Sequence, residues 1–422
     1  MSILEKTAEQ ADDVAERMAA KASLVGMPRA EVAARLVALG IEPFRAKQIW
    51  QWIYTKGAID FSEMSNIKKE TQALLAEHFS IARAGISRNA VSFDQTQKWL
   101  LKFADNQEVE TVFIPDAPRG TLCVSSQVGC TLSCTFCHTG TQRLVRNLTA
   151  GEIITQVLVA RDGLGEWSRS AASTGEKETK SARPAGLASH EPAERRSMAS
   201  AGARAGSKDK KAWAISSPAR QLTNIVFMGM GEPLYNYDNV VAACNLLMDG
   251  EGLAMSRRKI TVSTSGVVPK IVPLAKDAGT NLAISLHATT NELRNQIVPI
   301  NRKYPIEELL EACREYQSIV SDRHIMFEYV MLKGVNDSDE DAYRLIKLLK
   351  GIRSKMNLIP FNPWPGAPYE CSSNNRIHSF GRILMKAGIA TPIRKTRGED
   401  IMAACGQLKS MSELKKGQKV KL

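Results

Sequence analysis

Three cysteines lie close together in a chain that contains few. Cys130, Cys134 and Cys137 follow one another at spacings of four and three residues, among eight cysteines in 422 residues. Structural zinc normally needs four ligands, but the chain has no second C-x-x-C pair, and Cys137 already occupies the direction open to its neighbour His138. A disulfide cannot use three thiols evenly. Because thiolates are the usual protein ligands of iron-sulfur clusters, the spacing favours a cluster with one iron left open.

The loop that carries these cysteines follows a predicted strand. Residues 121–127 have strand character, and after the loop Thr149 and Glu152 form a capping box that opens a predicted helix. Further strand patterns, mostly separated by helical ones, lie at 222–229, 260–266, 281–287, 325–332, 356–363 and 391–396. Repeated β/α units predict a parallel sheet, either open or rolled into a barrel.

Several predicted strands end in residues suited to ligand binding. Parallel strands present ligand groups at their carboxyl ends, so these residues would gather on one side of a barrel. A glycine there permits close approach of the backbone, and a carboxylate accepts from an ammonium group. The candidates are Gly231, Glu232, Ser263, Ser285, Leu286, His287 and Asn362. Taken alone, each is more typical of a turn or a cap.

Residues 28–80 have helical patterns and precede a predicted hairpin that pairs residues 96–103 with 108–115. The helical part alternates basic and aromatic side chains: Arg45, Lys47, Trp50, Trp52 and Tyr54. This alternation suits RNA stacking, although taken alone it is more typical of a packed aromatic core with a solvated basic face. The net charge of +12 favours a polyanionic partner but is also compatible with ordinary solubility.

Composition divides the chain further. Residues 168–220 are rich in alanine, serine, glycine and charged residues, so we expect a flexible insertion there. We expect an N-terminal extension (1–25), a helical accessory domain that binds RNA (26–92), a linking hairpin (93–118), a barrel (119–408) and a basic tail (409–422). With no signal segment and no apolar run of membrane length, the sequence predicts a soluble cytoplasmic protein.

Two further cysteines lie near the beginning and the end of the predicted barrel. Cys123 lies in the strand before the cysteine loop, and Cys405 follows the last predicted strand. The default interpretation of each is a buried apolar thiol. Basic residues at 394, 395 and 397 would favour a thiolate at Cys405, which makes a nucleophile there plausible.

The loop C-x-x-x-C-x-x-C after a strand, with Phe136 between the last two cysteines, resembles the radical S-adenosylmethionine (SAM) superfamily. Longer stretches resemble the RlmN-type family within it, whose members methylate C2 of adenine in 23S rRNA and tRNA. They are "VETVFIP", "CVSSQVGCTLSCTFCHTG", "MGMGEPL", "ISLHA", "NLIPFNPWPGAPY" and "RKTRGEDIMAACGQL". The likeness runs from the helical region to about residue 408 and leaves out the first 25 residues, the insertion and the tail.

The resemblance implies an α/β fold, a partial (β/α)6 radical SAM barrel with a small N-terminal helical accessory domain. It implies that Cys130, Cys134 and Cys137 bind a [4Fe-4S] cluster, that the seven strand-end candidates bind SAM, and that two SAM molecules serve each turnover. The implied RNA partners are 23S rRNA near the peptidyl-transferase centre and tRNA at the adenosine 3′ of the anticodon. A flavodoxin-like electron donor and a monomeric state are also expected.

The resemblance also assigns catalytic roles. C2 of adenine is electrophilic, so it cannot take a methyl group from SAM directly. In the family, one SAM methylates the cysteine that Cys405 matches, and a radical from a second SAM activates that methyl group, which then bonds to the adenine. By the resemblance, Cys123 breaks the protein–RNA adduct through a transient disulfide with Cys405. Glu110, in "VETVFIP", is the implied proton acceptor, and strand alternation would point it inward.

Three other functions share parts of this pattern. A methyltransferase that acts on C8 of the same rRNA adenosine, and confers antibiotic resistance, uses the same set of cysteines. A zinc-stabilised RNA-binding module would have no catalytic activity. An activase of glycyl-radical enzymes shares the cluster loop but gives no reason for Cys123 and Cys405.

Overall fold

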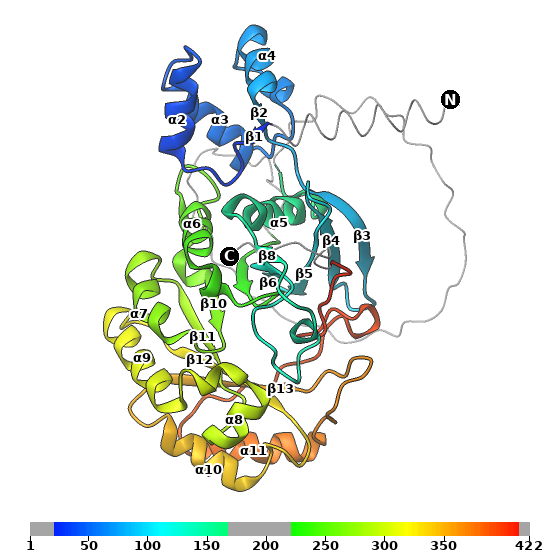
Figure 1. Cartoon of the computed structure of the whole chain (residues 1–422), viewed down its shortest axis with the longest axis vertical. Coiled ribbons are helices and arrows are strands. Elements are labelled where there is room, and N and C mark those ends of the chain that lie inside the picture. Colours follow the sequence, from blue (N-terminus) through cyan, green and yellow to red (C-terminus); the bar gives the residue numbers. More distant parts are fainter. Residues whose placement is uncertain (1–20, 168–220, 413–422) are drawn as a thin grey trace, which may run out of the picture. The chain divides into compact units, whose positions relative to one another are not determined.

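A computed structural model describes residues 21–167 and 221–412, and its core is a nine-stranded sheet (Figure 1). Six neighbouring strands are parallel and follow one another in chain order. They are β6 (Arg119–Cys123), β9 (Asn224–Phe227), β10 (Ile260–Thr264), β11 (Asn281–Ser285), β12 (Ile325–Met331) and β13 (Ser354–Pro360). A helix-containing crossover joins each strand to the next. This arrangement confirms the predicted partial (β/α)6 barrel.

The helices of the barrel place apolar faces toward the strands. They are α5 (Ala150–Gly163), α6 (Tyr237–Met248), α7 (Val268–Asp277), α8 (Asn291–Ile297), α9 (Ile306–Ile319), α10 (Asp339–Leu348) and α11 (Asn374–Lys386). The capping box predicted for α5 is confirmed, because the Thr149 hydroxyl accepts the Glu152 N–H at 3.2 Å and the Glu152 carboxylate accepts the Thr149 N–H at 2.8 Å. This box fixes where the chain leaves the cysteine loop.

The strand predicted at 391–396 is not a regular strand. Ala390 and Ile393 make single bridges to Lys355 and Leu358 of β13, so the segment lies alongside the last strand without joining the ladder. Pro392 explains the interruption, because proline has no N–H to donate. The N–H of Arg394 still donates to the Leu358 carbonyl at 2.8 Å. The prediction was therefore right about position and wrong about regular structure.

Three antiparallel strands extend the sheet beyond β6. They are β3 (Gly85–Val91), β4 (Gln97–Lys102) and β5 (Glu108–Asp116), and β4 pairs with β5 in the predicted hairpin. Figure 1 shows the C-terminal segment, drawn in red, beside β3 and β4. The extension thus supports the C-terminal segment, about 300 residues further along the chain, because the Lys98 ammonium donates to the Met402 carbonyl.

Helices α2 (Arg29–Ala38), α3 (Arg45–Tyr54) and α4 (Lys69–His78) precede the sheet, flanked by the short paired strands β1 (Ala22–Ser23) and β2 (Phe79–Ser80). Trp50 and Tyr54 are buried in their core, with ring centroids 4.5 Å apart. Trp52 is only half-buried and carries the Lys56 ammonium 3.8 Å from its ring centroid. Two of the three aromatic side chains therefore pack in the core, and the third, Trp52, forms a cation–π pair with Lys56 nearer the surface.

Short elements complete the described residues. The paired strands β7 (Gln127–Val128) and β8 (Arg146–Asn147) bracket the cysteine loop. The 3-10 turns are η1 (Phe61–Glu63), η2 (Thr139–Thr141), η3 (Pro233–Asn236), η4 (Arg257–Lys259), η5 (Pro299–Arg302) and η6 (Glu399–Ile401). No helix within 21–167 and 221–412 is long and apolar enough to cross a membrane. The predicted insertion at 168–220, residues 1–20 and residues 413–422 lie outside the described residues.

One backbone contact joins the N-terminal helical region to the start of α5. Gly26 has a φ of +86°, donates its N–H to the Tyr54 hydroxyl at 2.9 Å, and leaves no room for a Cβ, which would lie 2.1 Å from the Gly151 Cα. Gly40 has a similar φ of +72° but open space around it. Comparing substitutions of these two glycines therefore separates the cost of a left-handed backbone from the cost of steric overlap.

We expect Gly40→Ala to lower the free energy of unfolding by about 1–2 kcal/mol, the cost of the left-handed conformation for a residue with a Cβ. Gly26→Ala should lower it by about 1–3 kcal/mol more, because the overlap with Gly151 adds a packing cost. Urea denaturation of the full chain measures both values. Equal losses in the two variants would contradict the contact.

Candidate active site

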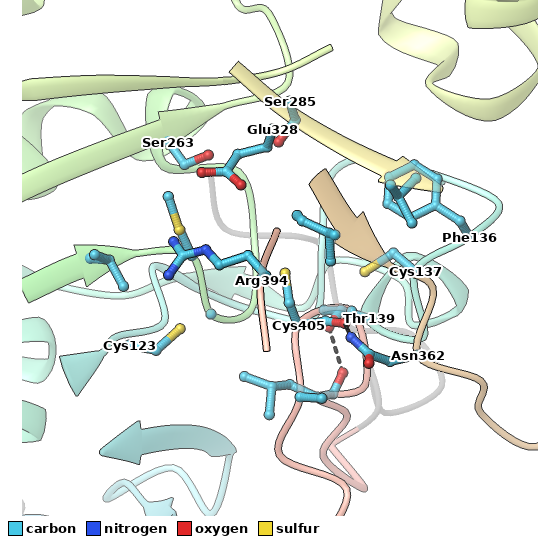
Figure 2. Close-up of a pocket in the computed structure, with 18 of the residues that line it drawn as sticks. Cys123, Phe136, Cys137, Thr139, Ser263, Ser285, Glu328, Asn362, Arg394 and Cys405 are labelled. Carbon is cyan, nitrogen blue, oxygen red and sulfur yellow. Dashed lines mark hydrogen bonds between the residues drawn. The ribbon is translucent and has the colours of Figure 1, made fainter. Parts of the chain in front are cut away.

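A cavity of about 400 Å³ opens at the carboxyl ends of the parallel strands (Figure 2). Residues from all six parallel strands or the loops after them line it, together with the cysteine loop and the C-terminal segment. Active sites of β/α barrels lie at this end of the strands. The volume suits a small-molecule ligand.

The three loop cysteines face this cavity together. Cys130, Cys134 and Cys137 all contribute to its lining, and the loop that carries them closes on itself where the Cys130 N–H donates to the Gln142 carbonyl at 3.2 Å. Burial and, to a smaller extent, the neighbouring Cys137 together raise the pKa of the Cys134 thiol to about 12. The thiols therefore lie close enough to repel one another as thiolates, which is the situation that a bound cation or cluster relieves.

His138 does not join the cysteines. Its ring stacks on Trp364, with centroids 4.9 Å apart and planes 6° from parallel, and its Nδ1 lies 3.2 Å from the Gln407 carbonyl oxygen. It is absent from the cavity lining. Within the described part of the chain, no three His, Cys, Asp or Glu side chains converge on a single metal ion.

The donor set fits an iron-sulfur cluster, in which each thiolate binds a different iron. Three thiols from one loop face a shared space, and the adjacent histidine is engaged elsewhere. Such a cluster would keep one iron for an exogenous ligand, and the strand-end residues line the same cavity.

Gly231 and Glu232 lie where the sequence predicts, just beyond β9. Gly231 has a φ of +97°, and a Cβ on it would come within 2.5 Å of the Gln127 side chain. The buried Glu232 carboxylate accepts the N–H of Leu234 at 3.1 Å and that of Ser265 at 2.8 Å. Burial nevertheless raises the pKa of Glu232 to about 7. A cationic ligand group in the cavity would favour its charged form.

Most other strand-end candidates also line the cavity. Ser263, Ser285, His287 and Asn362 do so, whereas the Leu286 side chain is fully buried in the core and does not reach the lining. The Val330 N–H donates to His287 Nδ1 at 3.1 Å, and burial lowers the pKa of His287 to about 3. The ring is therefore neutral, with its proton on Nε2.

Arg294 organises these strand ends, and sequence reasoning missed it. The fully buried guanidinium of this α8 residue donates to the carbonyls of Ser265 at 2.6 Å, Ser285 at 3.0 Å and Leu286 at 3.0 Å. It thereby ties the loop after β10 to the end of β11. Nothing in "NELRNQI" distinguishes this arginine from one on a helix surface, so no sequence signal marks it.

Cys123 and Cys405 reach the same cavity from different segments. Figure 2 shows the side chains of Cys123 and Cys405 turned toward the shared space that Cys137 also faces. The Asn362 amide donates to the Cys405 carbonyl at 3.1 Å and so fixes its backbone. Burial raises the pKa of both thiols to about 12, although Arg394 acts in the opposite direction on each. All eight cysteines are free thiols in this structure.

Glu328 is a second residue that the sequence analysis did not single out. It lies on β12, is 4% exposed and lines the cavity, and the Asn357 amide donates to its carboxylate at 2.9 Å. Burial raises the pKa of this carboxyl, while Arg394 lowers it. A signal was available, since "IMFEYVM" places one carboxylate inside an otherwise apolar strand.

Glu110 lies outside the cavity lining. It is on the same face of β5 as Ile114 and Asp116, which do line the cavity, but its carboxylate is 2.7 Å from the Lys98 ammonium. It also accepts the Lys409 N–H at 2.9 Å. Burial raises the pKa of Glu110, and the ion pair with Lys98 opposes that shift. Glu110 therefore lies against the C-terminal segment, through its bond to Lys409, and is not part of the cavity wall.

Comparisons with known proteins agree with this geometry. Residues 22–81 match the family model for the ribosomal RNA large subunit methyltransferase N-terminal domain, and residues 210–346 match the model for the radical SAM superfamily. A crystal structure of a radical SAM methyltransferase from Sphaerobacter thermophilus is similar with a TM-score of 0.77 at 39% identity, covering 92% of this chain and 99% of that one.

Curated relatives extend the similarity over nearly the whole chain. The chain is 52% identical over 409 residues to a dual-specificity RNA methyltransferase RlmN of Novosphingobium aromaticivorans, covering 96% of this chain and 90% of that protein. It is 51% identical over 392 residues to the RlmN of Gluconobacter oxydans, covering 92% and 86%. The chain therefore belongs to the RlmN family of radical SAM methyltransferases.

Proposed function

We propose that this enzyme methylates C2 of adenosine in 23S rRNA, near the peptidyl-transferase centre, and in tRNA, at the adenosine 3′ of the anticodon. The relatives' name, dual-specificity RNA methyltransferase, supports two classes of RNA substrate. The observation that carries the proposal is a single cavity lined by the three loop cysteines together with Cys123 and Cys405. A zinc-stabilised binding module or an activase would have no use for these two additional thiols.

Cys130, Cys134 and Cys137 would hold a [4Fe-4S] cluster at the cavity wall. When bound, the cluster and SAM supply one-electron chemistry that generates a carbon radical able to remove hydrogen from an unactivated methyl group. Around this position, Glu232 offers a carboxylate to the ammonium group of SAM, and the neutral His287 offers an Nε2–H donor. Gly231, Ser263, Ser285 and Asn362 line the remaining wall, and we assign Leu286 a backbone contact only.

Cys405 would serve as the methyl carrier. Its sulfur takes a methyl group from one SAM, with loss of the thiol proton and release of S-adenosylhomocysteine, and a second SAM serves the radical step of the same turnover. Cys123 then attacks the Cys405 sulfur of the protein–RNA adduct. A sulfur–sulfur bond forms as the sulfur–carbon bond breaks, and the carbon keeps the electron pair and takes a proton. An external dithiol reductant must then supply two electrons and two protons to return the disulfide to the two thiols, which face one cavity.

Glu110 is the proposed acceptor of the C2 proton. Burial raises the pKa of this carboxyl, which brings it closer to the working pH of a general base. For this role the adenine must approach from the cavity side, past the C-terminal segment that covers Glu110.

The remaining assignments concern partners. We propose that the helical accessory domain at 26–92 and basic residues at the cavity mouth contact RNA, with the target base turned out of its stack. We also propose that the enzyme is monomeric and cytoplasmic, where its RNA substrates are, and receives electrons from a flavodoxin-like donor.

The direct test is the identity of the product. Reduced, reconstituted enzyme with isotope-labelled SAM should convert unmodified fragments of 23S rRNA and tRNA to 2-methyladenosine, identified by chromatography and mass spectrometry against 2-methyl and 8-methyl standards. An 8-methyl product would overturn the site of methylation. Label in rRNA alone would overturn dual specificity, and label in neither would overturn the proposed function.

Cys123→Ala should trap the covalent intermediate, because the thiol that breaks the adduct is missing. We expect a nuclease-sensitive, RNA-linked protein band on a denaturing gel and release of methylated RNA near background. Cys371→Ala is the matched control, since Cys371 is exposed and outside the cavity lining. Absence of the band under conditions in which wild-type enzyme turns over would argue against the adduct.

Glu110→Gln should lower RNA methylation about 10²- to 10⁴-fold, because the amide keeps a hydrogen-bond acceptor for Lys409 but cannot take a proton. Methylation of Cys405 by SAM, measured by mass spectrometry of the protein, should not change. Lys98→Met breaks the ion pair but keeps the carboxylate, so it should retain more RNA methylation. If Glu110→Gln keeps RNA methylation close to the wild-type rate, the glutamate is not the base and only supports the fold.

A further inference from the structure

We propose that Phe93, at the tip of the β3–β4 hairpin, stacks on an RNA base adjacent to the target adenosine. The inference rests on the proposed function, because it names the part of the enzyme that contacts the RNA beside the methylated position. Phe93 is 93% exposed, which is more than any other large apolar side chain in the described residues. It belongs to neither the cavity lining nor the apolar core.

Hydrogen bonds hold the turn at the hairpin tip in spite of this exposure. The Ser92 N–H donates to the Thr96 carbonyl at 2.8 Å, and the Asp94 carboxylate accepts the Thr96 N–H at 3.0 Å. These bonds close the turn on both sides of Phe93. Because the backbone is already ordered, the ring would contact a partner at a low cost in conformational entropy.

The tip is also tied to the segment that carries Cys405. Asp94 accepts the Gly398 N–H at 3.2 Å and lies 3.8 Å from the Arg397 guanidinium. The Ser92 hydroxyl donates to the Asp400 carboxylate, and the Phe93 N–H lies 3.4 Å from the same group. These contacts hold the hairpin tip against residues 397–400, which lie in the segment that leads to Cys405.

Acidic and basic groups both lie near the hairpin tip: Asp94 of the tip and Asp400 make its contacts to residues 397–400, and basic side chains lie in the same segment. Arg394, Lys395 and Arg397 all line the cavity from the segment that the hairpin tip contacts. A phosphate backbone that passes this rim would meet three positive side chains, and a ring beside it would meet bases. This combination of an aromatic side chain and cations is typical of a surface that binds single-stranded or unstacked nucleic acid.

The chemistry of the reaction supplies the need for such a ring. An adenine must leave its stack to reach Cys405 within the cavity, and its former neighbour then loses a stacking partner. An aromatic ring fixed beside the cavity would replace that partner. Stacking of a base on an aromatic ring contributes about 1–3 kcal/mol.

Val91 offers a matched control on the same hairpin. It is 54% exposed and two residues from Phe93, but it cannot stack on a base. If the hairpin instead docked against an apolar protein surface, truncation of Val91 and truncation of Phe93 would weaken binding to a similar degree. If the contact is stacking, only the ring matters.

The test uses the full-length reconstituted enzyme and an RNA fragment that contains the target adenosine. Phe93→Ala should raise the KM for RNA about 5- to 150-fold, the range that corresponds to one stacked base, while Cys405 methylation by SAM is unchanged. Phe93→Trp should restore the KM to within about threefold of wild type, and Val91→Ala should stay within about twofold. Fluorescence of 2-aminopurine placed next to the target should be quenched by wild type and by Phe93→Trp, but not by Phe93→Ala.

An unchanged KM and an unchanged quenching in Phe93→Ala would overturn the inference, as would equal losses in Phe93→Ala and Val91→Ala. Fluorescence anisotropy of labelled RNA measures binding without turnover. The stacking contact can therefore be judged even if the wild-type product shows the proposed function to be wrong.

Discussion

The site depends on hydrogen bonds to residues 397–412, a stretch of backbone whose only regular element is the short turn η6. This stretch must hold Cys405 toward the cavity. Buried peptide groups need partners, and here other segments provide them. The His138 N–H donates to the Gly406 carbonyl at 2.7 Å, and the Thr139 hydroxyl donates to the Leu408 carbonyl. The cysteine loop therefore positions both its own thiols and Cys405. A change in that loop would displace both at once.

The charges around the cavity follow the same logic. Arg294 is fully buried, and its hydrogen bonds all go to neutral oxygens, so they leave its positive charge uncancelled. This charge lowers the pKa of Cys134, although burial raises it more. Burial raises the pKa of Glu232 to about 7 and also raises the pKa of Glu328. Arg294 thus offsets part of the cost of a thiolate at Cys134, and a positive charge near Glu232 would favour the charged form of that carboxyl, which is the polarity that a thiolate-bound cluster and an ammonium group require.

The sequence predicted what depends on local patterns and short spacings. The cysteine loop, the α5 capping box and the β4–β5 hairpin were all predictable, because neighbouring residues determine them. The segment at 391–396 was predicted as a strand, but Pro392 breaks the ladder there. Arg294 could not be found, since its role depends on three carbonyls brought near by packing. Phe93 gave no signal either, because only the fold shows that the hairpin turn contacts the segment before Cys405 and leaves Phe93 uncovered.

Glu110 joins these themes, because one carboxylate is both a proposed base and a support for the segment that carries Cys405. Its two oxygens bind the Lys98 ammonium and the Lys409 N–H, and Lys98 also donates to the Met402 carbonyl at 3.0 Å. A proton placed on Glu110 removes the attraction to Lys98 and weakens the bond from Lys409. Any step that transfers a proton to this carboxylate therefore loosens the segment on both sides of Cys405. Proton transfer to Glu110 and loosening of the C-terminal segment that covers it are thus physically linked.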